Sequence, residues 1–168
     1  MVTRLRIFAL WVVALGFAAA AHAGTDGQLT LAADLRADAE TSRKQGIPIL
    51  LFYSLKGCPY CEVIRASHLL PMQRDAATTK LRVIIRQVNL QDSAALRDFA
   101  GRMTTHREYS QAQQISFAPV VTLVDGEGRA LVEPMKGAML PDFYGAHLDD
   151  AIAAATARLA ASAKEKAR

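Results

Sequence analysis

The strongest constraint on the fold is an apolar run that leads into a closely spaced pair of cysteines. Residues 49–53 are continuously apolar and have the length of a strand, which predicts a strand buried on both faces. The only two cysteines of the chain, Cys58 and Cys61, follow shortly after. Pro59 suits the first position of a helix, where its missing N–H costs nothing. The stretch therefore predicts a buried strand, a short loop and a helix that begins at the cysteines.

The expected place of Cys58, at the N-terminus of this helix, favours a reactive thiol. Free backbone N–H groups and the helix dipole stabilise negative charge there, so we expect a lowered pKa for Cys58 and a nucleophilic thiolate. Cys61 follows one turn later, within reach of Cys58 and more deeply buried. We predict that Cys58 attacks, that Cys61 resolves the mixed disulfide, and that Pro59 and Tyr60 complete the active-site motif.

Three other uses of a cysteine pair fit the sequence less well. A structural disulfide across three residues closes a very small loop and constrains the unfolded chain least. A zinc site needs four ligands, and the histidines after residue 23 show no finger spacing. Covalent haem attachment needs a histidine directly after the second cysteine, where Glu62 stands. We therefore expect no metal, and no cofactor motif is visible.

Residues 1–23 are typical of a cleavable signal peptide. Arg4 and Arg6 supply the positive charge, residues 7–20 are apolar, and Ala21-His22-Ala23 fits the small-x-small cleavage pattern. An uncleaved N-terminal anchor is the alternative. Either form implies export to an oxidising compartment, most simply a bacterial periplasm.

The mature chain has the size of one domain. We predict a single domain over residues 24–163 and a disordered tail over residues 164–168. The formal net charge of +4 falls to +2 when Arg4 and Arg6 are removed with the signal peptide. Because the basic residues form no concentrated patch, the sequence does not indicate nucleic-acid binding.

The order of the expected elements predicts an α/β fold, with a central mixed sheet flanked by helices on both faces. Pro71 is expected to end or kink the helix that begins after Cys58. The other expected helices cover residues 31–45, 93–103, 106–114 and 140–163. The other expected strands cover residues 81–90, 120–124 and 130–132, with a turn at residues 125–128.

Two motifs resemble the thioredoxin superfamily: the CPYC tetrapeptide at residues 58–61 and the FAPVVTLVDG run at residues 117–126. The resemblance covers residues 29–159 and implies a thioredoxin-like fold. It also implies that the Ala118–Pro119 peptide is cis and packs against the cysteines. The backbone of Phe117, Ala118 and Pro119 would then bind substrate as an additional strand. An ordinary trans proline at the start of a strand is the alternative.

The chain departs from the superfamily at one position beside the cysteines. Many thioredoxins carry a buried acid six residues before the first cysteine, and Phe52 occupies that position here. The departure speaks against efficient thioredoxin-like reduction. Lys56 could help to hold the Cys58 thiolate and Glu62 could oppose it, but both are more typical of solvated surface residues.

Together these features predict a periplasmic thiol–disulfide oxidoreductase. The closest resemblance is to exported bacterial thioredoxin-like proteins. The expected substrates are protein disulfides or dithiols, and the expected redox partner lies in or at the inner membrane. The sequence does not specify the direction of electron flow.

The alternative function is that of a non-catalytic metallochaperone or assembly factor whose cysteines deliver copper, although few Met and His residues lie beside the motif. An isomerase would usually need a dimerisation domain, which the sequence does not show.

Overall fold

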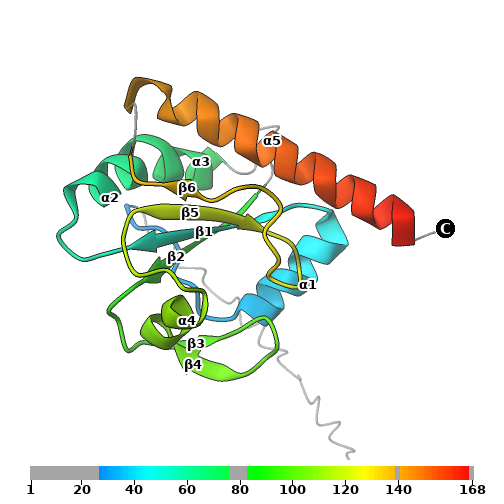
Figure 1. The fold of residues 1–168 in the computed structure, drawn as a ribbon, viewed down its shortest axis with the longest axis horizontal. Coiled ribbons are helices and arrows are strands. Elements are labelled where there is room, and N and C mark those ends of the chain that lie inside the picture. Colours follow the sequence, from blue (N-terminus) through cyan, green and yellow to red (C-terminus); the bar gives the residue numbers. More distant parts are fainter. Residues whose placement is uncertain (1–26, 76–82, 139–140, 167–168) are drawn as a thin grey trace, which may run out of the picture.

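A computed structural model describes residues 27–75, 83–138 and 141–166, so the expected signal peptide lies outside the described residues. A four-stranded sheet forms the centre of the molecule (Figure 1). Strand β1 pairs in parallel with β2 and antiparallel with β5, and β5 pairs antiparallel with β6. The predicted mixed sheet is therefore confirmed. The strands, in their order across the sheet, are β2 (Ile84–Asn89), β1 (Ile49–Ser54), β5 (Val120–Val124) and β6 (Met135–Lys136).

Strand β1 is buried along its whole length, as its apolar run predicted. Leu50 and Phe52 point into one core cluster, and Ile49, Leu51 and Tyr53 point into the other. This alternation is the two-residue period of a strand covered on both sides. Because β1 and β2 are parallel, their carboxyl ends lie at the same edge of the sheet.

Helices cover both faces of the sheet (Figure 1). Helices α1 (Leu35–Gln45) and α4 (His106–Ala112) pack on one face, through Leu35 and Tyr109 among others. Helices α2 (Pro59–Ile64) and α5 (Pro141–Lys166) pack on the other, through Ile64 and Leu148 among others. The sequence predicted this arrangement of layers.

The first helix begins later than the periodicity of residues 31–45 suggested. Asp34 caps α1, and its side-chain carboxylate accepts the Ala37 N–H at 2.9 Å. Before the cap the chain is extended, because Leu31 bridges to Gln87 on β2. The helix ends as expected at Gly46, which adopts the left-handed conformation with φ of 64°.

The predicted helix over residues 93–103 is wrong. The segment forms a hairpin of β3 (Ala95–Arg97) and β4 (Met103–Thr105). The turn between them is held by Asp98, whose carboxylate accepts the Arg102 N–H at 2.9 Å, and by Gly101, whose φ is 84°. An aspartate that bonds to the nearby backbone and a glycine with positive φ both favour a turn over a helix.

The chain after β5 also departs from the prediction. Residues 130–132 were expected to form the returning strand, but they form no named strand. Ala130 bridges back to Val124 on β5, and the Leu131 N–H donates to the Leu123 carbonyl at 2.8 Å. The Leu131 carbonyl accepts a hydrogen bond from Arg158 on α5, so this part of the chain is directed toward the helix. The edge strand forms later, as β6.

Pro71 does not end the helix that follows the cysteines. A π-helical turn, η1 (Arg65–Leu69), joins α2 to α3 (Leu70–Arg74), and Pro71 lies inside α3. The Leu70 N–H donates to the Arg65 carbonyl, five residues back. A proline ring clashes with the carbonyl four residues before it, and a widened turn moves that carbonyl away.

Helix α5 closes the domain and extends through Lys166, three residues beyond the predicted end. The part of the predicted tail at residues 164–166 is therefore helical, and residues 167–168 lie outside the described ranges. Lysines in a last turn interact favourably with the helix dipole. Across the described ranges, no helix combines the length and apolar character needed to cross a lipid bilayer.

Candidate active site

Cys58 caps α2, as the sequence predicted. It follows β1 after a three-residue loop, and its backbone is extended while that of Pro59 is helical. The Cys58 sulfur accepts the Cys61 N–H at 3.2 Å, and its carbonyl accepts the Glu62 N–H at 3.1 Å. The sulfur thus takes the place of a capping oxygen at the positive end of the helix dipole, where a thiolate would be stabilised.

The two cysteines differ in their access to solvent. They form a disulfide with their Cα atoms 5.2 Å apart. Cys61 is 0% exposed and belongs to the core cluster of Phe52 and Ile64, whereas Cys58 is only partly buried against that cluster. A substrate can therefore approach Cys58 more readily than Cys61, and the order of attack and resolution stays a prediction.

The proline loop lies at the same edge of the sheet as the cysteines. The Ala118–Pro119 peptide is cis, the isomer that the resemblance implied. Pro119 directly precedes β5, whose Val120 pairs with Tyr53 near the end of β1. Ala118 packs against the same cluster as Cys58. The fold thus brings together two motifs that are far apart in the sequence.

The surface beside Cys58 carries exposed apolar side chains. Tyr60 and Val63 are exposed on α2, and Phe117 is exposed in the loop before Pro119. The packing of the strands and helices does not account for the exposure of these apolar side chains. An apolar surface around a reactive sulfur suits a protein substrate better than a small polar one.

Phe52 occupies the position six residues before Cys58, where the resemblance implies a buried acid. Its ring is fully buried in the cluster that contains Cys61. The guanidinium of Arg65 lies over this ring, with its central carbon 5.9 Å from the ring centroid. The sequence alone indicated no role for Arg65, although its spacing from Glu62 is that of a helical ion pair.

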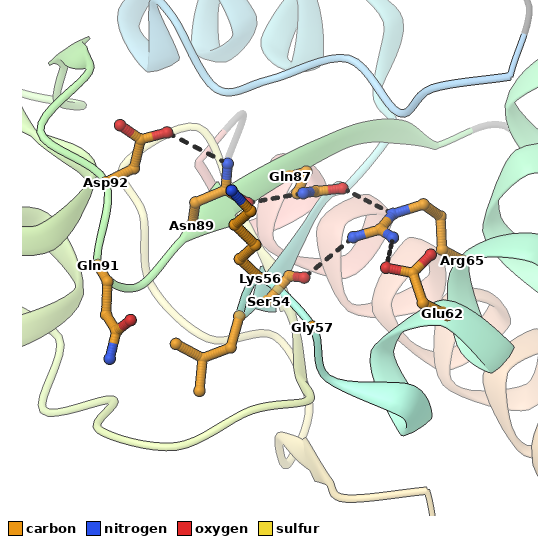
Figure 2. A pocket seen from close by; sticks show the side chains of 10 residues that line it. Ser54, Lys56, Gly57, Glu62, Arg65, Gln87, Asn89, Gln91 and Asp92 are labelled. Carbon is orange, nitrogen blue, oxygen red and sulfur yellow. Dashed lines mark hydrogen bonds and ion pairs between the residues drawn. The ribbon is translucent and has the colours of Figure 1, made fainter.

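Arg65 is the centre of a polar network that lines a pocket of about 500 Å³ beside the cysteines (Figure 2). It forms an ion pair with Glu62 and donates to Ser54 Oγ and Gln87 Oε1, each at 3.1 Å. Glu62 is therefore more than the solvated surface charge that the sequence suggested. Lys56 lines the same pocket from the loop before Cys58, and it is exposed, as expected.

A buried histidine, His106, holds Asn89, which also lines this pocket. The Asn89 N–H donates to His106 Nδ1 at 3.1 Å, and the Asn89 side chain accepts from Gln87 at 2.6 Å. His106 is 1% exposed. Burial lowers the pKa of His106, and the nearby Asp92 carboxylate and the Ala32 backbone partly offset the shift. The imidazole is therefore held neutral, with Nδ1 as the acceptor.

Comparison with known proteins assigns the chain to a family. The family model described as a thioredoxin-like domain matches residues 35–152. No curated protein matches the chain significantly.

Several solved structures are similar to the chain at low sequence identity. A thioredoxin-fold protein from Helicobacter pylori is 20% identical, with a TM-score of 0.46 over 73% of this chain and 86% of that one. A DsbH oxidoreductase is 19% identical, with a TM-score of 0.49 over 73% and 85%. Fasciola hepatica thioredoxin is 15% identical, with a TM-score of 0.46 over 72% and 96%. On the family match, which spans most of the domain, the chain belongs to the thioredoxin-like domain family, and with its Cys58–Cys61 pair it is a thiol–disulfide oxidoreductase.

Proposed function

We propose that the protein works in the periplasm and exchanges disulfides with protein substrates. The observation that carries the proposal is the position of Cys58, which caps α2 through its sulfur and is the more exposed member of the pair. Such a sulfur is a good nucleophile when reduced and an accessible target when oxidised. The signal-peptide pattern of residues 1–23 supports the location.

In the reducing direction, the Cys58 thiolate attacks one sulfur of a substrate disulfide. The new Cys58–substrate bond forms as the substrate S–S bond breaks, and the leaving thiolate takes up a proton. Cys61 then loses its proton, and its thiolate attacks Cys58 Sγ. The second substrate thiolate leaves and is protonated, so two electrons have passed from the cysteine pair to the substrate. The oxidising direction is the reverse of these steps.

The proline loop is the proposed guide for the substrate chain. Phe117, Ala118 and Pro119 lead into β5 at the edge where Cys58 lies, so an extended substrate segment can lie along their backbone. The exposed Tyr60 and Phe117 rings offer apolar contacts on either side. If the protein acts as a reductant, it needs an electron donor in or at the inner membrane, because the periplasm is oxidising.

Trapping of the mixed disulfide tests the location and the substrate class together. The full-length Cys61→Ser chain, produced in a Gram-negative bacterium, should accumulate in the periplasmic fraction as covalent adducts with other proteins, because no thiol remains to resolve them. Dithiothreitol should release the adducts, and the Cys58→Ser/Cys61→Ser double variant should form none. Absence of adducts would contradict protein substrates, and retention of the chain in the cytosolic fraction would contradict the location.

A further inference from the structure

A buried cation lies close to the cysteine pair, on the side of the sheet core. Arg65 follows Cys61 by one helical turn, and its backbone N–H donates to the Cys61 carbonyl. Its side chain is only 16% exposed. The guanidinium lies over the ring of Phe52, which shares a core cluster with Cys61. The position that the resemblance assigns to an acid is thus apolar, and the charge that lies against its ring is positive.

We propose that Arg65 and Glu62 are positioning residues that set the redox equilibrium of the cysteine pair with opposite signs. The cation of Arg65 favours the thiolate of the reduced pair, and the carboxylate of Glu62 opposes it. The inference rests on the proposed function and adds a direction to it, since stabilising the reduced form makes the disulfide a stronger oxidant.

The spacing along the helix places each charged residue about one turn after a cysteine. Residues four apart on a helix are surface neighbours, which pairs Cys58 with Glu62 and Cys61 with Arg65. The π turn that begins at Arg65 widens the helix at this point. Its guanidinium reaches toward Ser54 on β1 and Gln87 on β2, as Figure 2 shows.

The two charges differ in burial, so their effects should differ in size. The Glu62 side chain is 58% exposed, whereas that of Arg65 is 16% exposed. Solvent and salt screen an exposed charge more strongly than a buried one. The cation should therefore outweigh its partner in the field at the sulfurs.

Hydrogen bonds fix the guanidinium in place. Ser54 Oγ and Gln87 Oε1 each accept one N–H of Arg65, and Gln87 is itself held by its donation to Asn89. Ser54 is the last residue of β1, which is buried along its whole length, and Gln87 lies in the second half of β2, which is mostly buried. A charge on such rigid supports acts on the sulfurs from a constant position.

Equilibration with glutathione measures the proposed effect. One protein disulfide and two glutathione thiols give one protein dithiol and one glutathione disulfide, so the redox buffer at the midpoint reports the equilibrium constant. Arg65→Met should shift the equilibrium toward the protein disulfide by about threefold to tenfold, where tenfold is about 30 mV. Glu62→Gln should shift it in the opposite direction by a smaller factor. Arg65→Lys, which keeps the charge, should stay close to the wild type.

Arg86 provides a matched control for the loss of a partly buried, paired arginine. It pairs with Asp38 at 2.6 Å on the α1 side of the sheet, away from the cysteines. Arg86→Met should lower the stability of the fold and leave the glutathione equilibrium unchanged. Circular dichroism of each variant shows whether it is folded. If Arg65→Met is not, a shift of Glu62→Gln toward the protein disulfide would by itself overturn the inference.

Two results would overturn the inference. Equal shifts in Arg65→Met and Arg65→Lys would show that packing, and not charge, matters at this position. Shifts of the same sign in Arg65→Met and Glu62→Gln would exclude opposed charges. A wild-type protein that exchanges no disulfide with glutathione would instead contradict the proposed function, so the two failures are distinguishable.

Discussion

Replacement of Cys58 with serine is expected to reduce disulfide exchange to the uncatalysed rate, a loss of at least about a hundredfold. A serine hydroxyl is not ionised at neutral pH and forms no bond of the disulfide type, so the helix N-terminus has no thiolate to stabilise. The measurement is the rate of insulin reduction with dithiothreitol as the electron source. The stability of the variant should be compared with that of the reduced wild type, because the Cys58–Cys61 disulfide is also lost.

Cys61→Ser is the matched variant for this experiment. It keeps Cys58 and should still form mixed disulfides, although it cannot complete the reaction. Insulin reduction that survives in Cys58→Ser would contradict the mechanism. Stoichiometric capture of Cu(I) by a wild type that shows no turnover would favour the metallochaperone alternative.

Replacement of His106 with leucine is expected to lower the free energy of unfolding by about 2–3 kcal/mol at neutral pH. The variant leaves the Asn89 N–H buried without its acceptor, at the end of β2 and beside the polar network of Arg65. Chemical denaturation at neutral pH measures the loss. His106→Asn retains a side-chain acceptor near the position of Nδ1 and should lose less, so equal losses in both variants would contradict the role of the hydrogen bond.

The same histidine should make the stability of the wild type depend on pH. Because burial lowers the pKa of His106 from its ordinary value of 6.5, the unfolded chain binds a proton at a higher pH than the folded one. The stability that the neutral His106 imidazole adds to the folded state is fully present above about pH 6.5. It is lost as the pH falls toward the lowered pKa. His106→Leu should show a shallower loss over this range. An identical slope in the variant would show that other groups cause the acid sensitivity.

The sequence predicted the parts of the site that depend on local signals. The apolar run of β1, the helix start at Pro59 and the proline before β5 each carry their own pattern, and the structure has all three. The hairpin at β3 and β4 was missed because Leu96 and Phe99 have helical spacing. Turn chemistry at Asp98 and Gly101 overrides that spacing.

The contacts of Arg65 could not be predicted from the sequence, for a different reason. Its acceptors, Ser54 and Gln87, lie on two strands that become neighbours only in the folded sheet. The contact of His106 also forms only in the folded chain, because its partner Asn89 lies seventeen residues earlier. Such contacts depend on strand register, which a helical or strand period alone does not specify.

The most direct test of the account is the titration of the Cys58 thiol in the reduced Cys61→Ser protein, followed by the ultraviolet absorbance of the thiolate. The cap of α2 predicts a midpoint at about pH 7 or below, against about 8.5 for a free cysteine. A midpoint at or above the value of free cysteine would contradict the claim that the helix N-terminus activates Cys58.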